Sequence, residues 1–425
     1  MGIEETLKKY KWMIPIIEKA DRETKRLLMK NFRQKKQNFY PAEEGYKADV
    51  DNLIKCMLCP NMCRFECGTL QAAQSETMSP TYKARIGYYL TVGKIDPTKK
   101  ENQAFIDLMY KCSNEESCKV WCPFEFSVVS LLETVRDDLN TKGLMPTYCK
   151  EQINKLKDSN TIEGYNIFET YKEKGIDNIE TDGNDEVFYY IGCESMKFPN
   201  VVKTNIEILK KAGIKFSTNL EKKVCCGGPA FNIRDLDTGK QFAEKNKELI
   251  KSTGAKIVIS DCPGCVLTLT DRYKKAGIDV ETNVLHIVQF FAQLIEEGKL
   301  KFNTNISDEY KIVSIHDPCL IAKNLNDITS IRAILTKIPG LEIIEPMYNK
   351  EYVHCCGWSG TAHWADKDLA IKEATNRIAE LKQTGAKIFI SACPLCELGL
   401  AYGITDADKE NLQVMDISEL LIKVI

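Results

Sequence analysis

Two stretches of the chain, TGAKIVISDCPGC (253–265) and TGAKIFISACPLC (384–396), are nearly identical and lie 131 residues apart. The match extends outward, since VCCG (224–227) matches HCCG (354–357) and NVLHIVQFFAQLI (283–295) matches QVMDISELLIKVI (413–425), both at an offset of 130. The opening cysteines of the two copies, Cys193 and Cys319, are 126 residues apart. Self-similarity of this length, with the cysteines in register, indicates a duplicated structural unit.

Each copy alternates strand-like and helix-like segments. The apolar runs that end at or near cysteines have the length of buried strands: EVFYYIG (186–192), KIVIS (256–260), YKIVSIH (310–316) and KIFIS (387–391). Stretches of helical period cover 200–212, 237–253 and 366–384, and each is followed by a glycine. The alternation predicts an α/β fold with mostly parallel sheets, in which functional residues collect beyond the carboxyl ends of the strands.

The domain organisation follows from length and composition. A chain of 425 residues is long enough for two to four domains. We expect a mostly helical domain over 1–150, with a helix over 2–37, then a linker over 151–185. The two repeated α/β units then cover 186–300 and 310–425.

Composition excludes several classes of function. Lys and Arg number 58 against 60 Asp and Glu, so the chain lacks the basic surplus of a nucleic-acid-binding protein. Apolar runs are too short for a membrane span, and the first residues do not resemble a signal peptide, so we expect a cytoplasmic protein that reaches a membrane only through a partner. The chain contains neither of the glycine-rich nucleotide-binding motifs GxGxxG and GxxxxGKS. Any flavin is therefore expected on a partner protein.

The chain has 18 cysteines, and clustered cysteines in a reducing compartment are typical metal ligands. Each repeated unit carries five, spaced C-x31-CC-x35-C-x2-C in the first and C-x35-CC-x36-C-x2-C in the second. A structural zinc site needs four ligands, and a redox CxxC pair would leave three cysteines without a role. Five thiolates therefore favour a polynuclear iron–sulfur centre, with zinc in one unit and unligated buried cysteines as the alternatives. The two sets are Cys193, Cys225, Cys226, Cys262 and Cys265, and Cys319, Cys355, Cys356, Cys393 and Cys396.

Glycine and proline beside these cysteines favour the same interpretation. Gly227 and Gly357 follow the paired cysteines and permit the sharp turn that lets adjacent side chains face one metal group. Pro263 and Pro394 stand where the first turn of a helix is expected, and free N–H groups there would stabilise thiolate charge.

Seven further cysteines precede the repeats. The spacing C-x5-C-x3-C-P at 112–123 matches a ferredoxin run, except that Glu115 takes the place of the second cysteine. In two-cluster ferredoxins the last cysteine of each run ligates the other cluster. One predicted cubane set is Cys56, Cys59, Cys63 and Cys122, and the other is Cys67, Cys112 and Cys118 with Glu115 as an oxygen ligand. A three-iron or labile second cluster, and zinc at 56–67, stay open.

The two five-cysteine sets resemble the CCG domains of the heterodisulfide reductase family. That family includes the iron–sulfur subunits of anaerobic glycerol-3-phosphate dehydrogenase, glycolate oxidase and lactate-utilisation complexes. The 44-residue gap between Cys67 and Cys112 is similar to the helical ferredoxin domains fused to CCG domains there. The resemblance implies a noncubane [4Fe-4S] cluster in each five-cysteine set, with the two clusters facing each other across a disulfide substrate.

Two functions follow from this resemblance. Both motifs are complete, which favours a heterodisulfide-reductase-like subunit that passes electrons from N-terminal cubane clusters to a small disulfide. The alternative is an electron-relay subunit of a flavin-dependent dehydrogenase, of the glycerol-3-phosphate, glycolate or lactate type, that feeds a quinone or another carrier. Both imply a partner, either an electron-donor protein or a flavoprotein subunit. A zinc-bearing structural protein is the third interpretation.

The sequence also suggests roles for three other residues. His316 precedes Cys319 by three positions, where an imidazole suits either hydrogen bonding to a sulfide or a simple structural role. His286 matches Asp416 in the repeat, which favours a role at a helix start, and Cys149 belongs to no set.

Overall fold

The computed structural model describes residues 21–22, 25, 48–162, 176, 186–220 and 224–425. The chain divides into Met1–Tyr46 and a compact unit over Lys47–Ile425, which contains all eighteen cysteines. The helix predicted over 2–37 lies almost wholly outside the described residues.

The N-terminal part of the compact unit is helical, as predicted. Ser79 caps α6 by accepting a hydrogen bond from the Tyr82 N–H, and Pro80 follows in the first turn. The long helix α9 buries apolar side chains such as Leu132 and Val135 against its neighbours. The helices are α4 (Val50–Met57), α5 (Gly68–Ala73), α6 (Pro80–Thr91), α7 (Gln103–Tyr110), α8 (Ser117–Val120), α9 (Val128–Thr141) and α10 (Thr147–Ser159).

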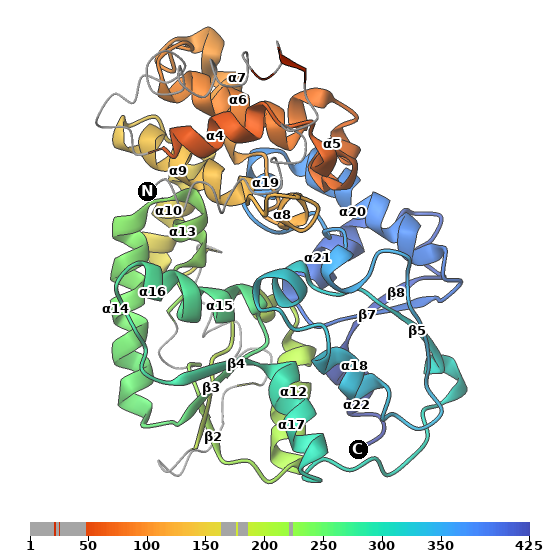
Figure 1. Cartoon of the computed structure of the whole chain (residues 1–425). Helices are drawn as coiled ribbons and strands as arrows, with labels where there is room; N and C mark the ends of the chain where they lie inside the picture. Colours follow the sequence, from red (N-terminus) through yellow and green to blue (C-terminus); the bar gives the residue numbers. More distant parts are fainter. Residues whose placement is uncertain (1–20, 23–24, 26–47, 163–175, 177–185, 221–223) are drawn as a thin grey trace. The chain divides into compact units, whose positions relative to one another are not determined.

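The first repeated unit is a four-stranded parallel sheet with strand order β2-β1-β3-β4. Its strands are β1 (Val187–Tyr189), β2 (Phe216–Thr218), β3 (Ile257–Ser260) and β4 (Asn283–His286). Its helices are α12 (Pro199–Lys211), α13 (Gly228–Ile233), α14 (Leu236–Thr253), α15 (Pro263–Leu267), α16 (Tyr273–Lys275) and α17 (Ile287–Glu296). Figure 1 shows α14 on one side of these strands and α12 and α17 on the other.

The second unit repeats this topology, with strand order β6-β5-β7-β8, again all parallel. Its strands are β5 (Ile312–Ile315), β6 (Glu342–Ile344), β7 (Ile388–Ser391) and β8 (Gln413–Asp416). Its helices are α18 (Ser330–Leu335), α19 (Ala362–Ala365), α20 (Lys367–Lys382), α21 (Pro394–Gly403) and α22 (Ile417–Leu421). The α/β prediction is confirmed. The four predicted strands are β1, β3, β5 and β7, the central strands of the two sheets, whereas the sequence interpretation missed the edge strands β2, β4, β6 and β8.

Strand order decides where the cysteines meet. In a sheet of order 2-1-3-4 the connections leave β1 and β3 in opposite directions, which opens a crevice beyond their carboxyl ends. Cys193 follows β1 and Cys262 follows β3, while Cys319 and Cys393 follow β5 and β7 in the second copy. The topology therefore brings cysteines far apart in the sequence to one edge of each sheet.

The predicted role of His286 at a helix start is confirmed. His286 caps α17 by accepting the Val288 N–H, and the Gln289 side-chain oxygen accepts the His286 N–H, which completes a capping box. Asp416 makes the same arrangement at α22 with Ser418 and Glu419. The duplicated helix therefore begins with the same cap chemistry in both copies, although the residue differs.

The buried His286 cap predicts a pH dependence of stability. Burial lowers the pKa of His286 to about 4, below the roughly 6.5 of an unfolded chain, so below pH 6.5 the unfolded chain binds a proton that the folded one does not. Stability should therefore fall as the pH drops from 6.5 towards 5, by up to about 1.4 kcal/mol per pH unit. His286→Asn keeps a capping side chain without this titration, so urea midpoints should show a shallower slope for the variant. Equal slopes would contradict the prediction.

Candidate metal centres

The first five-cysteine set converges at the edge of the first sheet. All five side chains are buried, and the Sγ atoms of Cys193 and Cys225 lie 3.7 Å apart. The thiols of Cys225 and Cys265 both hydrogen-bond to the sulfur of Cys226, and Cys265 also pairs with Cys262. Sulfurs from three separate loops therefore lie in one group, which is what a shared polynuclear centre requires.

The local backbone has the expected form. Gly227 has φ +77°, in the left-handed region that favours glycine, and the following N–H of Gly228 donates to the Cys226 sulfur over 3.4 Å. Pro263 stands in the first turn of α15 and Cys262 is its N-cap residue, as predicted. Pro394 and Cys393 have the same places at α21.

The second set converges in the same way. The thiols of Cys319 and Cys355 hydrogen-bond to each other, and Cys356 is bonded by Cys355 and Cys396. The Gly357 N–H donates to the Cys355 sulfur over 3.3 Å. Hydrogen bonds from Cys355 and Cys396 lower the pKa of the Cys356 thiol to about 6, so the group readily supplies a thiolate.

The two sets are neighbours. Cys265 bonds to Cys262 and lowers its pKa, but burial and the negative charges of Cys393 and Cys226 outweigh this and raise it to about 11. Cys393 belongs to the second set, so its charge acts directly on the first. The duplicated units thus present their cysteine groups to each other.

A cavity of about 510 Å³ opens beside the first set. Apolar side chains from both units line it, including Phe231 and Leu267 from the first and Leu320, Trp358 and Leu395 from the second. The Trp358 ring stacks on Tyr402 with centroids 4.6 Å apart. The cysteines on the lining are Cys193, Cys226, Cys262 and Cys265.

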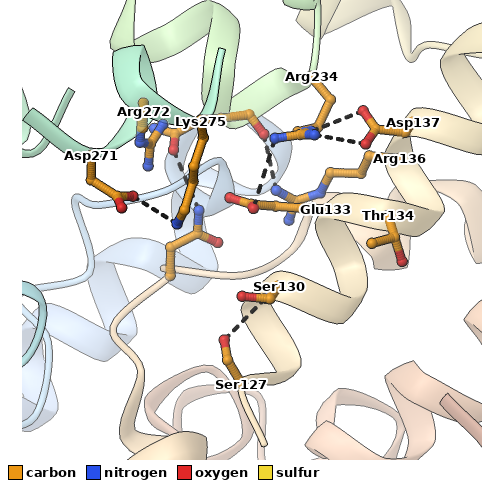
Figure 2. A network of polar contacts seen from close by, with 12 residues as sticks. Ser127, Ser130, Glu133, Thr134, Arg136, Asp137, Arg234, Asp271, Arg272 and Lys275 are labelled. Atoms are coloured by element: carbon orange, nitrogen blue, oxygen red, sulfur yellow. Dashed lines mark hydrogen bonds and ion pairs between the residues drawn. The ribbon is translucent and has the colours of Figure 1, made fainter. Parts of the chain in front are cut away.

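Charged side chains also line this cavity, among them Arg234, Asp271, Arg272 and Lys275, whose polar contacts Figure 2 shows. Arg234 makes a bidentate ion pair with Asp137, at 2.7 and 2.8 Å, and Lys275 pairs with Asp271 at 2.7 Å. The Arg272 guanidinium donates to the Gly228 carbonyl over 3.2 Å, beside the Cys226 group. Arg272 is therefore a cation close to the cysteines of the first set. The neighbouring cations Arg234 and Lys275 are already in ion pairs.

The arrangement of the two sets agrees with a family match. The model of the cysteine-rich CCG domain matches residues 187–270 and 313–401. The chain carries two CCG cysteine-rich domains. Its two CCG domains are the two repeated units described above.

Curated relatives of this CCG-domain protein are components of redox enzymes. It is 28% identical to one subunit of the dihydromethanophenazine:CoB–CoM heterodisulfide reductase of Methanosarcina barkeri, over 77% of this chain and 81% of that one. It is 25% identical to one subunit of the CoM/CoB fumarate reductase of Methanothermobacter marburgensis (89% and 73%). The EtfAB:quinone oxidoreductase of Syntrophomonas wolfei is 24% identical (88% and 58%).

These findings identify the chain as an iron–sulfur oxidoreductase subunit that functions in electron transfer and carries iron–sulfur clusters. Such subunits work with partner subunits. In the described part of the chain, no helix combines the length and apolar character needed to cross a membrane.

The N-terminal cysteines of this CCG-domain protein form two further groups. Burial and then the charges of Cys63, Cys59 and Cys122 raise the pKa of Cys56 to about 12, so these four thiols are close neighbours. They are the four cysteines of the first predicted cubane set.

The second group lies beside carboxylates. Burial, and then the charges of Glu116, Cys112 and Cys67, raise the pKa of Cys118. One Glu116 oxygen is buried without a hydrogen-bond partner among the described residues. The sequence interpretation did not single out Glu116, because only the Glu115 position matches the ferredoxin spacing.

Glu115 connects this second group to the second CCG domain. Its carboxylate accepts the N–H of Gly68 at 3.0 Å through one oxygen and the N–H of Cys355 at 2.9 Å through the other. Oxygens of Glu115 and Glu373 and the Cys355 sulfur lie within 4.8 Å of one another. Metal ligation by Glu115 stays a prediction, and its contact with Cys355 is a link that the spacing did not indicate.

Other contacts hold the two regions together. The Thr361 N–H donates to the Cys112 carbonyl over 3.1 Å. A Cβ atom at Gly360 would lie 2.5 Å from the same carbonyl oxygen, so only glycine permits this approach. The Lys323 ammonium donates to the hydroxyl of Ser117 and to the carbonyl of Val353. The second N-terminal group and the second CCG domain are therefore in direct contact.

Proposed function

We propose that this protein reduces a low-molecular-weight disulfide at two noncubane [4Fe-4S] clusters, one in each five-cysteine set, with electrons supplied through N-terminal cubane clusters. The observation that carries the proposal is that the two complete sets are neighbours and that a cavity of about 510 Å³ opens beside the first of them. The overall reaction is RSSR′ + 2 e⁻ + 2 H⁺ → RSH + R′SH. When bound, the two clusters would each supply one electron and an iron site for sulfur.

The chain's own residues prepare this site. Leu320, Trp358 and Leu395 line the cavity and offer apolar surface against which part of a substrate can pack. The Arg272 guanidinium stands where it can stabilise negative charge on a departing sulfur or bind an anionic group of the substrate. We expect Arg272→Met to raise KM more than it lowers kcat if the group binds substrate in the ground state.

The N-terminal cysteines suit the supply of electrons. Cys59 and Cys122 are partly exposed, whereas every cysteine of the CCG sets is buried. Apolar side chains near them in sequence, such as Leu58 and Phe124, are more than half exposed. A redox partner that approaches here would pass electrons to the first cubane, then to the group of Cys112, which contacts the second CCG domain.

The second candidate function is an electron relay for a flavin-dependent dehydrogenase. The similarity to the EtfAB:quinone oxidoreductase favours it, as does the lack of a recognisable flavin or nucleotide motif in this chain. In that case the CCG clusters would pass electrons between carriers without cleaving a sulfur–sulfur bond.

One experiment separates these functions. The oxygen-free protein should contain about 16 iron atoms and as many sulfides if it holds four four-iron clusters, or about 12 if it holds three. With reduced viologen and a panel of small disulfides, including anionic ones, the reductase should release two thiols per disulfide. A relay would exchange electrons with a flavoprotein but release no thiol. Zinc without iron would contradict both functions.

A further inference from the structure

His316 and Tyr190 occupy equivalent places in the two CCG domains. Each precedes the opening cysteine of its set by three residues. The His316 backbone N–H donates to the carbonyl of Ile390 at 2.9 Å, and that of Tyr190 to the carbonyl of Ile259 at 2.8 Å. Ile259 and Ile390 are themselves equivalent at the repeat offset of 131. The same backbone position therefore carries two chemically different side chains.

In the first domain the polar side chains at this place donate hydrogen bonds to backbone carbonyls. The Tyr190 hydroxyl donates to the carbonyl of Val224 over 2.5 Å. Asn246, which aligns with Arg377 at offset 131, donates to the carbonyl of Cys225 over 2.8 Å. Neither side chain has a free donor to direct at the first set.

In the second domain Arg377 determines the state of the imidazole. The Arg377 Nε–H donates to His316 Nδ1 over 3.1 Å, so Nδ1 carries a lone pair. An imidazolium carries a hydrogen on both nitrogens, so a ring that accepts at Nδ1 is neutral. A neutral imidazole whose Nδ1 accepts must carry its hydrogen on Nε2. Arg377 is held in turn by Glu380, at 2.7 Å, and by the carbonyl of Tyr348.

The Nε2 atom of His316 is buried and has no hydrogen-bond partner among the described residues. A ring nitrogen of His316 and the sulfurs of Cys356 and Cys396 lie within 4.8 Å of one another. Since Nδ1 is bonded to Arg377, Nε2 is the nitrogen left for these sulfurs. A buried donor without an acceptor is costly, so the structure has an unused N–H beside the second set.

We propose that the Nε2–H of His316 donates a hydrogen bond to a sulfur of the iron–sulfur centre in the second CCG domain, with Arg377 fixing the imidazole in the required tautomer. This proposal rests on the proposed function only for the presence of a cluster in that set. Hydrogen bonds to cluster sulfurs stabilise the reduced form and raise the reduction potential. The second centre is therefore easier to reduce than the first and receives electrons first, as its contact with the N-terminal cysteines also suggests.

The test is a potentiometric titration followed by paramagnetic resonance of the anaerobic holoprotein. His316→Phe keeps a buried ring but removes the donor. It should lower one midpoint potential by about 59 mV, a tenfold change in the ratio of reduced to oxidised centre for one electron, and leave the others unchanged. Tyr190→Phe is the matched control and should shift none. His316→Gln restores an N–H donor and should recover part of the shift.

A second measurement uses the wild-type protein alone. The reduced second centre should show coupling to one proton that exchanges in heavy water, and His316→Phe should lack it. Unchanged potentials in His316→Phe with full iron content would overturn the proposal, and so would loss of one cluster's iron, because His316 would then be a ligand. A shifted potential without any disulfide cleavage would uphold this inference and count against the proposed reductase activity.

Discussion

Cys226→Ser should remove the iron of one cluster, about four atoms per chain, and abolish disulfide cleavage. Cys226 receives hydrogen bonds from the thiols of Cys225 and Cys265 and from the N–H of Gly228, and it lines the cavity. It is thus at the centre of the first set and next to the place proposed for the substrate. Changes to outer partners of metal ligands cost about 10- to 100-fold in activity, so loss of a ligand should exceed that range.

Cys149→Ser provides the matched control. Cys149 is fully buried in α10 and belongs to none of the four groups. Burial raises the pKa of its thiol to about 12, so it stays protonated. Iron and sulfide analysis should give wild-type values for Cys149→Ser. Full iron content in Cys226→Ser would contradict the assignment of the first set.

Gly357→Ala should destabilise the second CCG domain by about 3 kcal/mol or more. Gly357 has φ +79°, and a Cβ atom there would lie 2.2 Å from the backbone oxygen of Ala370 in α20. The free-energy cost of the left-handed backbone conformation at alanine and the cost of the clash with the helix backbone add to each other. Because Gly357 directly follows Cys356, the loop should also lose its ability to present both cysteines to one centre.

Gly385→Ala separates the two contributions. Gly385 has φ +77°, but a Cβ atom there would meet nothing within 4 Å. Its cost should therefore be that of the backbone alone, about 1 kcal/mol. Urea unfolding and iron analysis measure both effects. Equal losses for the two variants, or full iron in Gly357→Ala, would show that α20 moves aside and that the turn is not essential.

The sequence by itself determined the duplication and the α/β class, and it predicts the membership of each cysteine group. The repeated pattern TGAKI-x-IS-x-CP-x-C predicts a strand, a helix N-cap and the first turn of a helix within thirteen residues. These features depend on local side-chain pattern and backbone preference. The spacing also predicts two N-terminal groups, because a ferredoxin run has a fixed pattern. The strands β2, β4, β6 and β8 were missed because they are the edge strands of the two sheets. They bury fewer residues than the central strands, so their apolar pattern is weaker.

Only the tertiary structure decided which residues contact one another between the cysteine groups. The proximity of Cys262 to Cys393, the contact of Glu115 with Cys355 and the direction of the His316 imidazole all join residues from different domains or distant elements. No local preference governs such contacts, because they depend on how packed surfaces fit. His316 and Tyr190 make the point directly: the sequence aligns them, but only the donors and acceptors around each ring decide which N–H or O–H remains free for a cluster.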